Sequence, residues 1–131
     1  MSARDCLSCF EAYDPPEFSP VKYFLLCRAI ELALKVLHLD NNDRKFVKDK
    51  LGHNLVKSYE GLEEDHKVLS SQELELLKKT SDLYESRIKA FEYIQPIHAA
   101  RGYTDFPDLA RLYGIAKKMV EYVERFQKEN P

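Results

Sequence analysis

Residues 21–39 read VKYFLLCRAIELALKVLHL, and this stretch decides the fold. The segment is almost entirely apolar, but four polar residues recur along it: Arg28, Glu31, Lys35 and His38. At about 100° per residue these positions fall within an arc of about 80°, so a helix here would have a single polar stripe. We therefore predict that residues 21–39 form a largely buried helix at the centre of the protein.

The composition of the whole chain also favours a helical protein. Its 131 residues suffice for one domain with a hydrophobic core, and 44% of them are hydrophobic while 32% are charged. Four glycines and six prolines leave few of the turns that an all-β sandwich or barrel needs. The net charge of -2 removes the simplest argument for a nucleic-acid-binding protein, a strongly basic surface, but leaves room for a local basic patch.

The chain divides into a short lead-in and one domain. Residues 1–19 are predicted to be an extended segment, because proline pairs such as Pro15-Pro16 disfavour a helix. Ser19 can cap the central helix, with Pro20 at its first position. Residues 20–131 are expected to form a helical-bundle domain.

Two helices are predicted directly after the central one. A short basic helix covers residues 44–51 and is stopped by Gly52. The next helix begins near His53-Asn54 and ends near His66. Its apolar residues recur at helical spacing and are predicted to point inward: Leu55, Tyr59 and Leu62.

A long helix is predicted to begin at a capping box, in which Ser70 is followed three residues later by Glu73. Ser81 fills the one polar gap in its apolar pattern, and Pro96 interrupts that pattern. The residues predicted to face the core are Leu74, Leu77, Tyr84, Ile88 and Phe91.

The last helix has the most regular apolar spacing in the chain. Thr104 or Asp105 is expected to cap it, with Pro107 in its first turn. Its predicted buried seam is Leu109, Leu112, Ala116, Met119, Val123 and Phe126. Antiparallel bundles use such seams, so we predict an all-α fold, an up-and-down bundle of four main helices plus one short helix.

Three cysteines, Cys6, Cys9 and Cys27, imply no disulfide framework, because their number is odd and Cys27 lies within the apolar central helix. Cys6 and Cys9 have the spacing of a zinc or redox pair, but no second pair completes a tetrahedral site, so we predict two unpaired thiols and no metal. No cofactor is expected. The lack of a membrane-spanning apolar run or a signal-peptide pattern indicates a cytoplasmic protein that does not enter a membrane.

Three segments of the chain match short motifs of one superfamily. Arg28-Ala29-Ile30-Glu31-Leu32-Ala33-Leu34-Lys35 is similar to an A-x-E-x-x-L-K stretch, and Gly52-His53-Asn54-Leu55 is similar to a G/T-H-D/N-L stretch. Leu83-Tyr84-Glu85-Ser86-Arg87 is similar to a Tyr-x-x-Arg motif on the following helix. Over roughly residues 21–125, the chain thus resembles the HEPN superfamily of small helical-bundle domains.

The resemblance implies an up-and-down bundle of four to five helices, frequently a homodimer. In many members of the family it also implies a metal-independent RNase of toxin–antitoxin or phage-defence systems. A partner of the antitoxin or nucleotidyltransferase type would accompany such a role.

The chain departs from the pattern of the nuclease members, in which an arginine is followed four to six residues later by a histidine. After Arg87, Glu92 or Tyr93 stands in that place, and the next histidine, His98, lies beyond Pro96. Without an imidazole there, no group titrates near neutrality to move the 2′-hydroxyl proton of RNA. The nuclease site is therefore expected to be degenerate.

The polar stripe of residues 21–39 allows two interpretations. Glu31 stands four residues before Lys35, so the two can form an exposed helical ion pair that contributes only about 0.2 to 0.5 kcal/mol. Alternatively, the stripe faces Arg87 across the bundle and forms a polar groove. Burial of the stripe would decide between them, because a buried charge needs partners.

Two basic features outside the stripe are also candidates for binding. His53, next to Gly52, either makes a structural hydrogen bond to a neighbouring helix or belongs to a ligand site. Arg44, Lys45 and Lys48 either form a solvated face or bind phosphate groups by charge alone.

Three functional hypotheses remain, and whether the protein is an enzyme stays open. The first, which we favour, is a HEPN-like domain with a degenerate nuclease site that binds RNA, a nucleotide or a protein partner. Its predicted ligand-binding residues are Arg28, Glu31, Lys35, His53 and Arg87. The second is a metal-independent RNase with a rearranged catalytic site, drawn from Arg87, Tyr93, Glu31 and His53. The third is a helical protein-interaction module unrelated to the HEPN superfamily.

Overall fold

The structure, a computed structural model, describes residues 2–14, 21–39, 54–92 and 107–130, with side chains of the third range described as far as Tyr84 except for Leu83. These ranges contain one 3-10 turn, η2 (Glu64–His66), and no strand. Their α-helices are α1 (Ala3–Ala12), α2 (Val21–Leu39), α4 (Leu55–Glu60), α5 (Ser71–Glu92) and α7 (Leu109–Glu129). The predicted all-α bundle is confirmed, but its helices are not all the predicted ones: α1 lies in a segment predicted to be extended, and α4 is a short helix where a long one was predicted.

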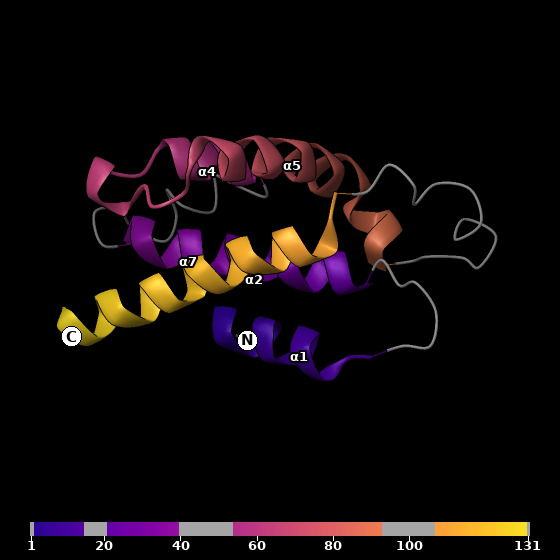
Figure 1. Ribbon diagram of the computed structural model, residues 1–131, viewed down its shortest axis with the longest axis horizontal. Helices are drawn as coiled ribbons and strands as arrows, with labels where there is room; N and C mark the ends of the chain where they lie inside the picture. Colours follow the sequence, from indigo (N-terminus) through magenta and orange to yellow (C-terminus); the bar gives the residue numbers. More distant parts are fainter. Residues whose placement is uncertain (1, 15–20, 40–53, 93–106, 131) are drawn as a thin grey trace.

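Helix α2 is the centre of the bundle, as its apolar sequence predicts. It contacts α1, α4, α5 and α7, and Figure 1 shows α1 and α5 on opposite sides of it, with α7 running alongside. The largest fully buried side chains on α2 are aliphatic apart from Glu31: Leu26, Ile30, Leu34 and Leu37. Burial on so many sides explains why the helix has so few polar positions.

The N-terminal segment was predicted to be extended, and for residues 3–12 this prediction is wrong. Ser2 accepts a hydrogen bond from the Asp5 amide at 3.1 Å, and Asp5 accepts one from the Ser2 amide at 2.8 Å. This capping box starts α1, whose Ala3, Cys6 and Leu7 are buried. The prolines follow the helix and do not interrupt it, whereas residues 15–20, with the predicted Ser19 cap, lie outside the described residues.

The predicted helix from His53-Asn54 to His66 is shorter than expected, because α4 ends at Glu60. Its predicted inward residues, Leu55, Tyr59 and Leu62, are all buried. His66 is not at a frayed end but is buried in η2, where its Nδ1 lies 2.7 Å from the Tyr122 hydroxyl of α7. The short basic helix predicted over residues 44–51 lies outside the described residues.

A serine on α5 caps α4. Asn54 accepts a hydrogen bond from the Lys57 amide at 2.9 Å, and Ser81 accepts one from the Leu55 amide at 3.1 Å and a longer one from the Val56 amide at 3.4 Å. The first amides of a helix have no partner within it, so these bonds satisfy donors that burial would otherwise leave unpaired. The polar gap in the α5 pattern therefore has a structural purpose.

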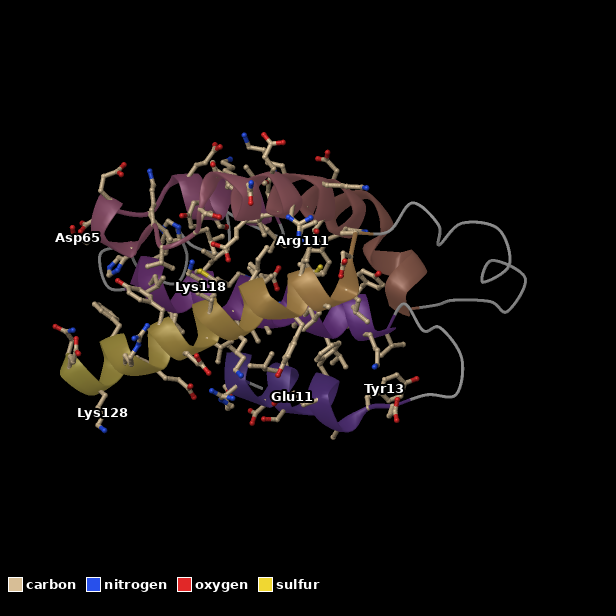
Figure 2. All side chains as sticks on the ribbon, in the orientation of Figure 1. Glu11, Tyr13, Asp65, Arg111, Lys118 and Lys128 are labelled. Carbon is tan, nitrogen blue, oxygen red and sulfur yellow. The ribbon has the colours of Figure 1, made fainter. Side chains whose placement is uncertain are left out.

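The capping box of α5 is confirmed. The Ser70 amide donates to Glu73 at 2.8 Å, and the Ser70 hydroxyl accepts from the Glu73 amide at 3.2 Å. Lys118 of α7 donates to the same Glu73 carboxylate at 2.8 Å, and Figure 2 shows Lys118 on the part of α7 near α5. This ion pair links the start of α5 to the middle of α7.

The cap of the last helix differs from the prediction. Asp108, not Thr104 or Asp105, accepts the Arg111 amide at 3.2 Å, and α7 begins after Pro107. The buried Tyr23 hydroxyl donates to the Pro107 carbonyl at 2.6 Å and holds this end of α7 against α2. The predicted seam is confirmed, since Leu112, Ala116, Met119 and Val123 are buried and Leu109 and Phe126 pack against the core.

Candidate functional site

The polar stripe of α2 is partly buried and does not lie on an open surface. Glu31 is 2% exposed and His38 is 5% exposed. The side chains of Arg28 and Lys35 are 35% and 24% exposed, so both reach solvent. The predicted ion pair of Glu31 and Lys35 is present, but it is not an exposed pair, because the carboxylate is in the core.

The Glu31 carboxylate is surrounded by three polar side chains, and we call these four residues the Glu31 cluster. Arg28, one turn earlier on α2, forms an ion pair with Glu31 Oε2. Lys35, one turn later, places its Nζ 3.9 Å from Glu31 Oε1. The Tyr84 hydroxyl of α5 donates to Glu31 Oε2 at 3.4 Å. A buried carboxylate requires such partners, because its desolvation costs several kcal/mol.

Tyr84 brings α5 into the cluster. It is fully buried, and the ring of Phe24 from α2 packs against it with a centroid separation of 6.3 Å. Burial first, and then the negative charge of Glu31, raise the pKa of the Tyr84 phenol above its ordinary value. Tyr84 therefore stays protonated at neutral pH and acts as a hydrogen-bond donor.

The charges in the cluster do not cancel. Burial disfavours the charged form of Arg28, but the Glu31 carboxylate outweighs this effect, and the pKa of Arg28 is raised. One carboxylate thus lies beside two cations, and the described cluster has a surplus positive charge at the partly exposed Arg28 and Lys35. A guanidinium has five N–H donors, so Arg28 can bind a second anion while it holds Glu31.

His38, the last residue of the stripe, faces a different partner. Its Nε2 donates to the Ser58 carbonyl of α4 at 2.6 Å, which fixes the proton on Nε2 because a carbonyl can only accept. A Cβ added to Gly61 would lie 3.3 Å from His38 Cε1, so a glycine after α4 leaves space for the ring. His38 therefore joins α2 to α4.

The other predicted site residues are not placed by the described part of the chain. Arg87 stands one turn after Tyr84 on α5, but its side chain is not among those described. His53 and Tyr93 lie outside the described residues. The same holds for the predicted phosphate-binding residues Arg44, Lys45 and Lys48. The structure thus brings together Arg28, Glu31 and Lys35 of the predicted set.

Tyr84 was predicted only as a core residue, and its part in the cluster was missed. The Tyr-x-x-Arg fragment on the predicted long helix was the available signal, because it placed a hydroxyl one turn before a candidate arginine. Helical spacing alone could not show that this hydroxyl meets Glu31.

The cysteines are free thiols: Cys6 and Cys27 are buried, and Cys9 is exposed. Burial, and then the charge of Glu31, raise the pKa of the Cys27 thiol, so it is unreactive at neutral pH. Among the described residues, no three side chains of the metal-binding types lie close enough to hold an ion. None of the described helices is long and apolar enough to cross a lipid bilayer.

The chemistry available to the described cluster is anion binding. The bonds described for the two imidazoles go elsewhere, from His38 to Ser58 of α4 and from His66 to Tyr122 of α7. Tyr84 is held as a neutral donor, and both Glu31 oxygens face cations. Such a site suits phosphate recognition by charge and hydrogen bonds.

Comparison of the chain with protein-family models, with curated proteins and with solved structures found no match, so the resemblance to the HEPN superfamily stays a prediction.

Proposed function

We propose that this chain is a HEPN-like helical domain with a degenerate nuclease site, which binds the phosphate groups of RNA or a nucleotide without cleaving them. The observation that supports the proposal is the Glu31 cluster. A buried carboxylate forms ion pairs with Arg28 and Lys35 at the edge of the bundle, where each cation still reaches solvent. Cations held in place lose less side-chain entropy on binding than free surface lysines do.

Arg87 and His53 belong to the proposed site through the family motifs. Arg87 follows Tyr84 by one helical turn, so its position on α5 is next to the cluster. If Arg87 joins Arg28 and Lys35, the site has three cations around one carboxylate. Phosphates of single-stranded RNA or of a nucleotide are the ligands that this arrangement favours.

The test is a binding measurement with a matched control. We expect a short fluorescein-labelled single-stranded RNA to bind the wild-type protein, and Lys35→Gln to weaken that binding about tenfold. The control is Lys79→Gln, which removes the same charge from an exposed position about 140° around α5 from Tyr84. Equal affinities for the wild type and both variants would contradict the proposal, and ATP in place of RNA tests the nucleotide.

Integrity of the RNA separates binding from catalysis. After prolonged incubation with the wild-type protein, the labelled RNA should run at its full length on a denaturing gel. Shortened RNA, with cleavage abolished by Arg87→Ala, would instead favour the RNase with a rearranged site. RNA that neither binds nor shortens would favour a helical interaction module.

The proposal includes a protein partner, as the resemblance implies. A homodimer is expected, and light scattering at high micromolar concentration should give twice the monomer mass; a monomer mass would contradict it. An antitoxin or nucleotidyltransferase-type protein is the further partner proposed. Three free thiols support a reducing location such as the cytoplasm.

A further inference from the structure

A groove lies between the C-terminal parts of α2 and α7, beyond the first residues of α1. It has a volume of about 440 Å³, and we call it the α2–α7 groove. Figure 1 shows that α2 and α7 both extend past the N-terminal end of α1. The groove-lining residues used below are Leu32, Lys35, Val36, Leu39, Val123 and Glu124.

The groove continues a surface that already binds a helix. Helix α1 contacts both α2 and α7, burying Cys6 and Leu7, and its Phe10 ring packs on Tyr113 of α7 at 5.0 Å. The first residues of α1, Ser2 to Arg4, form one end of the groove. Past that end, the walls of the groove come from residues 32–39 of α2 and residues 120–127 of α7, which extend beyond α1 in Figure 1.

The apolar lining has the spacing that a helix recognises. Leu32, Val36 and Leu39 follow each other at intervals of four and three residues, so they form one stripe about 10 Å long on α2. Leu39 is 40% exposed, one of the most exposed large apolar side chains described. Val123 of α7 forms part of the opposite wall. An amphipathic helix of about two turns matches this stripe.

The charged residues that line the groove are two cations, Arg4 and Lys35, and one carboxylate, Glu124. Arg4 and Glu124 bond to each other at 3.0 Å, so their charges offset one another. The ammonium group of Lys35 lies 3.9 Å from a carboxylate that Arg28 already pairs with. Lys35 therefore offers a positive charge to a ligand, and a carboxylate on the occupant is its complement.

We infer that the α2–α7 groove binds an acidic amphipathic helix of another protein, which presents apolar side chains at positions i, i+4 and i+7 and a carboxylate beside Lys35. This goes beyond phosphate binding, although Lys35 is common to both sites. The helix would lie in line with α1 and extend the cover that α1 gives to α2 and α7.

The test uses two synthetic peptides, each held helical by a side-chain staple. Both have leucines at i, i+4 and i+7; one has glutamates on the flank of this stripe, and its twin has lysines there. We expect the wild-type protein to bind the glutamate peptide about fivefold more tightly than the lysine peptide, as measured by fluorescence anisotropy. Lys35→Gln should remove most of this preference.

A matched pair of substitutions on α2 locates the binding. Leu39→Gln, in the groove, should weaken glutamate-peptide binding about fivefold, whereas Val21→Gln, at the other end of α2 and 37% exposed, should leave it unchanged. Both positions are exposed enough for the variants to fold, and circular dichroism checks this. RNA binding should be the same in Leu39→Gln as in wild type, so failure of the groove and failure of the phosphate site are distinguishable.

Four results would overturn the inference. The first is that the wild-type protein binds neither peptide at several hundred micromolar, and the second is that it binds both peptides with equal affinity. The third is that Leu39→Gln and Val21→Gln weaken binding of the glutamate peptide equally. The fourth is that the wild-type protein is a dimer and that Leu39→Gln converts it to a monomer. The last result would assign the groove to a second copy of the chain. Binding of dodecanoate that Leu39→Gln abolishes, without peptide binding, would assign it to a lipid-like anion instead.

Discussion

Two regions of the same polar stripe on α2 differ in the groups that they contact, and this difference distinguishes a structural contact from a candidate binding site. Around Glu31 the partners are charged, and Arg28 and Lys35 extend from the buried carboxylate to solvent. Around His38 the partner is the backbone carbonyl of Ser58 at 2.6 Å, and the ring is 5% exposed. The first region keeps donors for a ligand, whereas the second uses its donor within the fold.

The largest expected effect on stability comes from a substitution in the Glu31 cluster. Arg28→Ala should lower the free energy of unfolding by about 3 kcal/mol, because it takes the guanidinium away from a carboxylate that is 2% exposed and leaves the more distant Lys35 beside it. Glu31→Leu should cost less, about 2 kcal/mol, since the two cations that it releases already reach solvent and the main loss is the acceptor of the buried Tyr84 hydroxyl. Urea denaturation measures both.

A double variant sharpens this prediction. Arg28→Ala combined with Glu31→Leu should be more stable than Arg28→Ala alone, because the buried carboxylate is then absent. If the two destabilising effects were simply additive, Glu31 would not depend on Arg28, and our account of the cluster would be wrong.

The next largest effect comes from a substitution in the region around His38. His38→Phe keeps a ring in the core but removes the donor to Ser58, so it should cost about 2 kcal/mol for a buried carbonyl left without this donor. In a double variant of His38→Phe and Glu31→Leu, the two losses of unfolding free energy should add within about 0.5 kcal/mol. The reason is that the bonds described for the two regions share no partner. A larger coupling energy would show that the stripe acts as one network.

A substitution on α5 tests the other buried hydrogen bond to α4. Ser81→Ala should cost about 1.5 kcal/mol, because the Leu55 amide loses its acceptor inside the bundle. Asn54→Ala should cost about 1 kcal/mol as a comparison, since water can reach the amide that it caps. Equal destabilisation by the two variants would contradict the role given to burial.

The smallest effect on stability concerns Glu73, a carboxylate outside the regions around Glu31 and His38. Burial of Glu73 opposes ionisation, but its bonds to Lys118 and Ser70 outweigh this and lower the pKa. A lowered folded pKa contributes stability above the unfolded value of about 4.3, and this is lost as the pH falls through the folded value. Denaturation at pH 7 and at pH 3 should therefore differ less in Glu73→Gln than in wild type. If the stability difference between pH 7 and pH 3 were the same in Glu73→Gln as in wild type, ionisation of Glu73 would not contribute to the loss of stability in acid.

The helices were predictable where their signals are local. The capping box at Ser70 and the apolar seam of the last helix each lie within a few turns of chain, and the structure has both. The box at Ser2 is equally local, but the prolines that follow it led to the wrong prediction for α1. Proline limits the residues next to it and does not prevent a helix that ends before it.

The site was predictable only in part, because its contacts join distant segments. The spacing of Arg28, Glu31 and Lys35 placed them on one face, but their neighbours on that face were not visible in the sequence. The Tyr84 bond to Glu31 spans 53 residues, and the His38 bond to Ser58 spans 20. Only the packing of α2 against α5 and α4 decides which part of the stripe bonds to a tyrosine hydroxyl and which part bonds to a backbone carbonyl.

The salt dependence of RNA binding tests the central claim, that the charged half of the α2 stripe binds phosphate. On single-stranded RNA, the slope of log K against log salt concentration changes by about 0.7 for each phosphate that the protein neutralises. We predict a slope smaller by about that amount in Lys35→Gln than in wild type, and an unchanged slope in Lys79→Gln. Identical slopes in the wild type and both variants would contradict the claim.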